Sequence, residues 1–135
     1  MPWRLATEFR FDAAHRIDDY DGPCGRLHGH GYRVRLELEA ARLRPSAHLP
    51  KPEMVADFKT LRWAKRDRDQ GGLDHQLLNE QPGLAGTTAE QIASYLHAET
   101  LRRLRSALPP GDSGDDFKLT VTVWETEESC CAYWE

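Results

Sequence analysis

Two segments of the chain alternate apolar and polar residues with a period of two, and three histidines continue that alternation. In residues 3–13 the apolar side chains occupy odd positions, and His15 shares that parity. In residues 32–38 they occupy even positions, and His28 and His30 share that parity. Alternation with this period is typical of a half-buried strand. If the two strands pair as a hairpin, all three imidazoles enter the same side of the sheet near the connecting loop.

Three histidines on one inner surface indicate a metal centre. An apolar core has little use for three polar rings unless something satisfies them, and neutral imidazoles are good zinc ligands. Three protein ligands with an open fourth position are typical of a catalytic zinc site. Cys24 lies just before His28 and has two interpretations. It is either the fourth ligand of a closed structural site, or a nucleophile or base beside an open one.

Composition restricts the class of protein. With 135 residues, 39% of them hydrophobic and 30% charged, the chain is expected to form a single globular domain over 1–135. The net charge is −4, and acidic and basic residues are interspersed, so the sequence has no cluster of basic residues of the kind that binds nucleic acid. No stretch resembles a signal peptide or a membrane span, and three cysteines are an odd number for a disulfide framework. We therefore expect a cytoplasmic protein that binds neither nucleic acid nor membranes.

The rest of the chain predicts two helices followed by two strands. Asp57 is a good N-cap for the first helix, and Thr87 with Glu90, or Thr88 with Gln91, has the spacing of a capping box for the second. The predicted ranges are 57–69 and about 88–108 for the helices, and 117–125 and 129–134 for the strands. Hairpins with helices inserted between them indicate an α+β fold, with the helices on one face of an antiparallel sheet.

Two further sets of residues could take part in catalysis or binding. Asp74 precedes His75 and could raise the basicity of its ring as part of an acid/base pair, or it could simply cap a helical turn. Glu125 continues the apolar parity of 117–123, so its carboxylate needs a partner. That partner is either a ligand edge with two parallel N–H donors or an arginine of the protein. His48 and His97 are expected to be ordinary surface residues.

Motifs spread over most of the chain point to a known family. In order they are Phe11-Asp-Ala-Ala-His15-Arg, Cys24-Gly-Arg-Leu-His28-Gly-His30, Val55-Ala-Asp57-Phe58, Leu73-Asp74-His75, Thr87-Thr88-Ala89-Glu90 and Trp124-Glu125-Thr126. With these motifs the chain resembles the 6-pyruvoyltetrahydropterin synthase superfamily. Within it, the chain is most similar to the bacterial 6-carboxy-5,6,7,8-tetrahydropterin synthases of queuosine and 7-deazapurine biosynthesis. Gly31 departs from the family, which often has asparagine or serine there, at the rim of the site.

The resemblance implies a fold and an assembly. The fold is the tunnelling fold, or T-fold: a four-stranded antiparallel sheet with two helices on one face, in the order β-β-α-α-β-β. Members of the family associate side by side into barrels, with active sites between subunits. We therefore expect a homo-oligomer with a hexamer-like barrel, which would also pair the sheet edges that a lone domain exposes.

The resemblance also implies a role for each candidate residue. It makes His15, His28 and His30 the ligands of Zn²⁺, Cys24 the catalytic thiol, Asp74 and His75 the acid/base pair, Glu125 the anchor of the pterin ring, and Thr88 a second pterin contact.

The reaction implied is that of a zinc-dependent lyase. It would convert 7,8-dihydroneopterin triphosphate to 6-carboxy-5,6,7,8-tetrahydropterin, with release of acetaldehyde and triphosphate. The short gap between Cys24 and His28 resembles the carboxy-type enzymes. Two alternatives stay open: a 6-pyruvoyltetrahydropterin synthase, which eliminates triphosphate without cleaving a carbon–carbon bond, and a non-catalytic zinc- or pterin-binding module.

Overall fold

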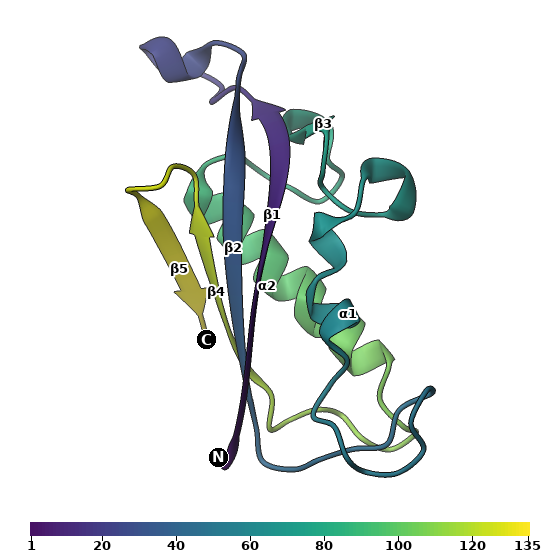
Figure 1. The fold of residues 1–135 in the computed structure, drawn as a ribbon. Coiled ribbons are helices and arrows are strands. Elements are labelled where there is room, and N and C mark those ends of the chain that lie inside the picture. The colour runs from purple at the N-terminus through teal and green to yellow at the C-terminus, as the bar shows by residue number, and fades with distance from the viewer.

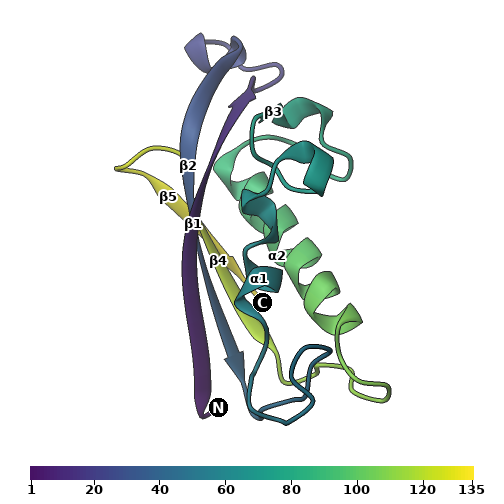
Figure 2. The same ribbon diagram turned by 45° about the vertical axis from the view of Figure 1, so that its right-hand side comes forward.

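The computed structural model describes residues 1–135, and its largest feature is a five-stranded sheet with the order β3-β1-β2-β4-β5. The strands are β1 (Trp3–His15), β2 (His28–Ala40), β3 (Gln76–Leu77), β4 (Lys118–Trp124) and β5 (Cys130–Trp134). The α-helices are α1 (Phe58–Leu61) and α2 (Ala89–Ser106), and the 3-10 turns are η1 (Pro23–Gly25), η2 (Trp63–Lys65), η3 (Arg68–Gln70) and η4 (Leu78–Glu80). Figures 1 and 2 show both helices on the same side of the sheet, which confirms the predicted α+β architecture.

The strands β1 and β2 form the predicted hairpin. They pair antiparallel along their whole length, from Trp3 opposite Ala40 to His15 opposite His28. His15 and His28 are therefore the last pair before the loop, and His30 lies opposite Ala13. The register places the three histidines together at the loop end of the hairpin, as their parity predicted.

The sheet has one strand more than predicted. The strand β3 has only two residues and pairs parallel with β1, with Gln76 opposite Ala13 and Leu77 opposite Ala14. Two residues are too few to show a period, so the sequence carried no signal for this strand. It brings the segment that follows Asp74 and His75 to the edge of β1, beside the histidine end of the hairpin.

The core lies between the sheet and α2. The alternating inward positions of β1, β2 and β4 are buried, as the period-two patterns predicted, and so is one stripe of α2. The principal buried residues are Phe9, Phe11, Tyr32, Val34, Leu36, Leu38, Ile92, Ala93, Leu96, Leu104, Leu119, Val121 and Val123. Burial of these side chains holds the hairpin flat against the helix and supplies most of the driving force for folding.

The prediction that His97 lies at the surface is wrong. Its side chain is buried in α2, with Nε2 donating to the carbonyl oxygen of Leu119 at 3.0 Å and its ring edge-on to Tyr133. Burial lowers the pKa of His97, so the neutral ring is favoured. The hydrogen bond to the sheet satisfies a polar ring on the apolar stripe of the helix. His48 is exposed, as expected.

The first helix is much shorter than the predicted 57–69. It begins as predicted, because the Asp57 side chain accepts a hydrogen bond from the backbone N–H of Lys59 at 2.8 Å. However, α1 ends at Leu61, and the chain continues through the separate 3-10 turns η2 and η3. Helical spacing of apolar residues therefore overestimated the length of regular helix in this region.

Hydrogen bonds to a returning segment explain why the chain does not continue as an α-helix towards residue 69. The carbonyl oxygens of Ala64 and Arg66 accept from the N–H groups of Leu73 and Asp74, at 2.9 and 3.0 Å. In a continuous helix these carbonyls would be bonded four residues further on. Gly72 permits the close approach, because a Cβ there would lie 1.9 Å from the carbonyl oxygen of Arg66. The returning chain thus replaces the helical bonds and leads directly into Asp74.

The second helix matches its prediction closely. Thr88 is the N-cap, and its hydroxyl accepts from the backbone N–H of Gln91 at 3.2 Å. Of the two capping pairs the sequence offered, the structure uses the second. Thr87 lies just outside the helix and is buried, and it bonds to the end of β1 instead. None of the helices is both long and apolar enough to cross a membrane.

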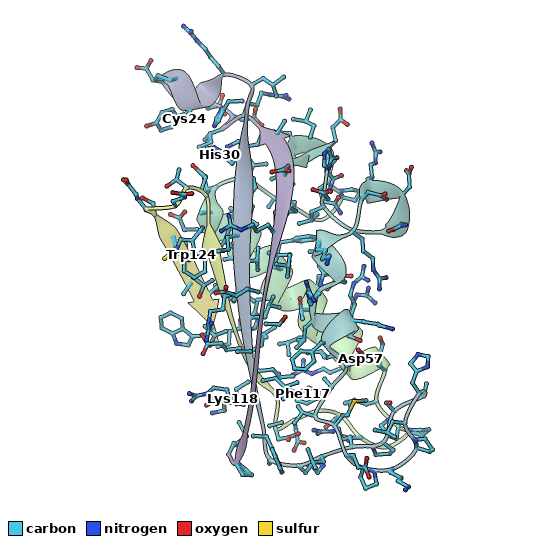
Figure 3. All side chains as sticks on the ribbon, in the orientation of Figure 1. Cys24, His30, Asp57, Phe117, Lys118 and Trp124 are labelled. Carbon is cyan, nitrogen blue, oxygen red and sulfur yellow. The ribbon has the colours of Figure 1, made fainter.

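The end of the molecule remote from the histidines is closed by a buried arginine. Arg44 is 4% exposed, pairs with Asp112 and Asp116, and lies over the ring of Phe117 at 4.4 Å. Its guanidinium lowers the pKa of both carboxyls, that of Asp116 to about 2. Figure 3 shows Phe117 at the opposite end of the molecule from Cys24 and His30. The cluster around Arg44 therefore holds the long 41–57 connection and lies away from the histidines.

Candidate metal centre and active site

Three imidazoles meet at the loop end of β1 and β2. One ring nitrogen of each of His15, His28 and His30 lies within 4.8 Å of the other two. His15 is fully buried, and the other two are partly buried. The three rings face one another edge to face, with centroids 4.5 to 5.0 Å apart. The structure therefore brings together the three histidines that the sequence singled out, in an arrangement that could hold a metal ion.

Two backbone carbonyls orient the rings. His15 donates from Nδ1 to the carbonyl oxygen of Thr87 at 2.9 Å, and His28 donates from Nδ1 to that of Arg26 at 2.7 Å. A carbonyl can only accept, so the proton of each neutral ring sits on Nδ1 and the lone pair sits on Nε2. Hydrogen bonding of the outer nitrogen to a carbonyl is what fixes a metal-binding histidine in other proteins.

The electrostatics of the cluster fit a cation. The Nε2 atoms of His15 and His28 are 3.0 Å apart, so two lone pairs face each other across the centre. The Nε2 of His30 is buried without any hydrogen-bond partner. Burial also lowers the pKa of His30, which disfavours relief by protonation of that ring. A divalent cation would satisfy all three nitrogens at once, and imidazole donors suit zinc and similar transition metals.

The thiol of Cys24 is not part of the metal cluster. Cys24 lies in η1 within the loop that joins β1 to β2, and its side chain is partly buried. Its carbonyl oxygen accepts from the N–H of Ile17 at 2.9 Å, which closes the base of the loop. The ligand atoms that gather within 4.8 Å are the three imidazole nitrogens alone. The geometry favours the open three-ligand interpretation, with Cys24 left as a free thiol at the same end of the molecule (Figure 3).

Asp74 and His75 form a directly bonded pair at the edge of the sheet. The ring of His75 donates from Nδ1 to Asp74 Oδ2 at 2.6 Å, and the other carboxylate oxygen accepts from the N–H of Asp12 at 2.8 Å. His75 adopts a left-handed backbone, φ 59°, and its N–H donates to the carbonyl oxygen of Asp12 at 2.7 Å. The Asp74 side chain therefore accepts one hydrogen bond from β1 and one from its neighbour His75, and it does not cap a helical turn.

The pair has the electrostatics of an acid/base couple. The hydrogen bond that His75 donates to Asp74 raises the pKa of His75, and the hydrogen bond from the N–H of Asp12 is the main cause that lowers the pKa of Asp74. The His75 side chain is 74% exposed, so its free Nε2 is accessible. A cavity of about 550 Å³ is lined by both His75 and His30, which connects the pair with the histidine cluster.

Glu125 follows β4 and reaches the edge of the histidine cluster. Its Oε1 lies 3.6 Å from His30 Nε2, and the side chain is 26% exposed. The charged group that it contacts within this chain is His30, and no arginine of the chain pairs with it. The carboxylate is thus free to accept from a ligand. Thr88 stands at the start of α2, where its hydroxyl is used as the helix cap.

Sequence reasoning missed the backbone groups that organise the site. Thr87 was considered only as a possible helix cap, yet its carbonyl holds the ring of His15. Likewise, Arg26 and Asp12 act through main-chain atoms, which any residue type could supply. No sequence pattern reports such a role, and only the register of β1 with its neighbours makes it visible.

Comparison with known proteins identifies the family. The sequence profile described as 6-pyruvoyl tetrahydropterin synthase matches residues 4–135. The chain belongs to this family. A 6-carboxy-5,6,7,8-tetrahydropterin synthase from Synechocystis is 36% identical over 131 residues, which cover 97% of this chain and 92% of the relative. A second protein of that name, from Haemophilus influenzae, is 28% identical over 98% of this chain and 99% of its own.

Solved structures of the family share the fold. The 6-pyruvoyl tetrahydropterin synthase from Caenorhabditis elegans superposes with a TM-score of 0.62 at 21% identity, over 98% of this chain and 95% of that one. The enzyme from Plasmodium vivax gives a TM-score of 0.66 at 18% identity, over 98% and 97%. At these identities the likeness concerns the fold, and it confirms the T-fold predicted from the motifs.

Proposed function

We propose that the protein is a 6-carboxy-5,6,7,8-tetrahydropterin synthase. With the uptake of one water molecule, it would convert 7,8-dihydroneopterin triphosphate to 6-carboxy-5,6,7,8-tetrahydropterin and release acetaldehyde and triphosphate, as a step of queuosine biosynthesis. The observation that carries the proposal is the set of three converging imidazoles, two of them fixed with their Nε2 lone pairs inward. The relative that is 36% identical over nearly the whole chain bears the same name.

We infer that the metal is zinc, held by His15, His28 and His30. Three nitrogen donors with a free fourth position are the arrangement of catalytic zinc. When bound there, zinc supplies Lewis-acid stabilisation of negative charge that develops on substrate oxygens. Cys24 stands outside the ligand cluster, which leaves its thiol available for proton transfer.

The remaining residues divide the work of binding and proton transfer. Cys24 would remove a proton from the side chain of the substrate, and the Asp74–His75 pair would return protons to it. Because the pKa of His75 is raised, its ring holds a proton at higher pH than a free histidine does. Glu125 would accept from the 2-amino and N3 hydrogens of the pterin, and Thr88 would contact the ring at the start of α2.

The chain is proposed to act as a single domain in a homo-oligomer located in the cytoplasm. The strand β1 has a partner on its outer side only at Ala13 and Ala14, and β5 forms the other edge of the sheet. Free edges of this kind favour pairing with further copies. A hexamer-like barrel would pair both edges, and light scattering after size exclusion measures the mass of the assembly.

The decisive experiment is product identification. Purified protein is incubated with 7,8-dihydroneopterin triphosphate, and the products are identified by mass. We expect 6-carboxy-5,6,7,8-tetrahydropterin together with acetaldehyde. A 6-pyruvoyl product without acetaldehyde would assign the protein to the other branch of the family. Substrate binding without any turnover would favour a pterin-binding module.

A further inference from the structure

Asn79 makes an unusual contact with the end of β1. Its side-chain amide bonds both main-chain groups of Arg16: Oδ1 accepts from the Arg16 N–H at 2.9 Å, and Nδ2 donates to the Arg16 carbonyl at 2.9 Å. A side-chain amide that pairs with one N–H and one C=O imitates a neighbouring strand. Asn79 is the only asparagine of the chain, and no role for it follows from the fold motifs alone.

The contact continues the sheet beyond the end of β3. The backbone pairing between β3 and β1 stops at Leu77 opposite Ala14, because the chain then turns into η4. Arg16 is two residues beyond Ala14, directly after the end of β1, and there the side chain of Asn79 takes the place of the missing strand. Without it, the N–H of Arg16 would have no partner in the protein, and its carbonyl would keep only one.

That remaining partner is the hydroxyl of Thr87, which donates to the same Arg16 carbonyl at 2.9 Å. Thr87 is also the residue whose carbonyl fixes the ring of His15. On the other side, Ile17 donates to the carbonyl of Cys24 at 2.9 Å. Arg16 therefore stands between the buried ligand His15 and the loop that carries the thiol.

We propose that Asn79 is a positioning residue, which holds the main chain beside His15 so that its imidazole is preorganised for the metal. The inference rests on the metal centre proposed above. His15 needs two fixed points, its own backbone and the Thr87 carbonyl, to direct Nε2 at the cluster. Asn79 fixes the first through the Arg16 N–H, which belongs to the peptide that joins His15 to Arg16. It fixes the second through the Arg16 carbonyl that it shares with Thr87.

The test measures metal affinity and geometry as well as activity. Zinc dissociation constants are obtained by competition with a chromophoric chelator, and the Co²⁺-substituted protein reports ligand geometry through its visible absorption. Supporting groups around metal ligands typically change affinity 10- to 100-fold. Asn79 acts through the backbone, so we expect Asn79→Ala to weaken zinc binding about 10-fold and to alter the cobalt spectrum.

Two further variants keep the inference testable if Asn79→Ala does not fold. Asn79→Asp retains the acceptor for the Arg16 N–H but sets a carboxylate against the Arg16 carbonyl, so it should also weaken zinc binding. Thr87→Val removes the hydroxyl and keeps the carbonyl that holds His15, so a smaller loss is expected. Because both side chains act on one carbonyl, the double variant should lose less than the sum of the single losses.

Gln81→Ala is the matched control. Gln81 lies two residues after Asn79 and also uses its amide twice, accepting from Gln76 at 2.9 Å and donating to Tyr95 at 3.1 Å, and neither bond is to β1. It should lower thermal stability and leave zinc affinity unchanged. Equal losses of affinity in Gln81→Ala and Asn79→Ala would overturn the positioning role, and so would wild-type affinity and cobalt spectrum in Asn79→Ala. If the wild-type protein binds no zinc, the metal centre itself is refuted.

Discussion

The Nε2 atoms of His15 and His28 face each other at 3.0 Å, while the Nδ1 of each ring is bonded to a backbone carbonyl. Neither ring can relieve this contact by moving its proton, since the carbonyl on the outer side requires a donor. A positively charged occupant between the rings removes the conflict. One carbonyl from the β1–β2 loop and one from the segment before α2 thus arrange these nitrogens for a cation.

The first prediction concerns the three histidines. We expect about one zinc ion per chain in the wild-type protein, and loss of that metal in His15→Ala, His28→Ala and His30→Ala, because two donors hold zinc poorly. Elemental analysis of the purified variants measures it. His48→Ala is the control, since His48 is exposed in the 41–57 connection and its variant should keep the metal. Full metal content in all three ligand variants would refute the assignment.

Substitution of Cys24 distinguishes an open metal site with three protein ligands from a closed site with four. Cys24→Ala is expected to abolish turnover and to retain zinc, because the thiol lies outside the group of ligand atoms. Product formation and metal content are measured on the same preparation. Cys130→Ala, at an exposed cysteine of β5, should keep both. Loss of zinc together with activity would instead make Cys24 a fourth ligand.

Much of the fold could be predicted because burial on one face imposes a period. The alternation around His15 and His30 gave the hairpin and the common side of the three rings, and the Thr88–Gln91 spacing gave the start of α2. The two errors in secondary structure, which are the length of the first helix and the unpredicted strand β3, have one physical cause. The returning segment around Gly72 takes hydrogen bonds that would have continued the first helix, and it delivers β3 to the edge of the sheet.

For the site, the sequence could offer residue types but not their partners. His15 was identified from parity, whereas the Thr87 carbonyl that orients its ring is a main-chain group without a sequence signature. For Glu125 the sequence left two kinds of partner open, and the contact with His30 depends on the three-dimensional placement of the end of β4 beside the histidines. For Asp74 the choice between helix cap and acid/base partner depended on a tertiary contact with Asp12.

Glu125 is expected to determine pterin recognition. Removing one partner of a desolvated, charged hydrogen-bonded pair costs about 2–5 kcal/mol. Glu125→Gln should therefore weaken binding of a pterin analogue strongly, since an amide nitrogen presents a donor where the ligand needs an acceptor. Titration calorimetry measures the affinity, and metal analysis checks that zinc is retained beside His30. Glu128→Gln, at an exposed carboxylate, should bind as the wild type does. Unchanged affinity in Glu125→Gln would mean that the pterin is held elsewhere.

The hydrogen bond between Asp74 and His75 is expected to make stability and reaction rate depend on pH. Because Asp74 raises the pKa of His75, the pair stabilises the fold fully below the ordinary histidine pKa of 6.5, and this contribution is lost as the pH rises through the raised value. Asp74→Asn removes the charge while its amide oxygen can still accept from Asp12. The pKa of His75 should then fall towards 6.5, and the alkaline limb of the pH–rate profile should move to lower pH if His75 donates a proton.

Histidine NMR measures this shift directly, since the ring Cε1–H signal of His75 can be followed through the titration in both proteins. Asp69→Asn is the control, because Asp69 is exposed in η3 and is not among the charges that raise the pKa of His75. Its titration curve should match that of the wild type. An unchanged His75 pKa in Asp74→Asn would show that the 2.6 Å contact does not control the protonation of the ring. A shifted pKa with an unshifted pH–rate profile would remove His75 from the proton-transfer step and leave it a binding role.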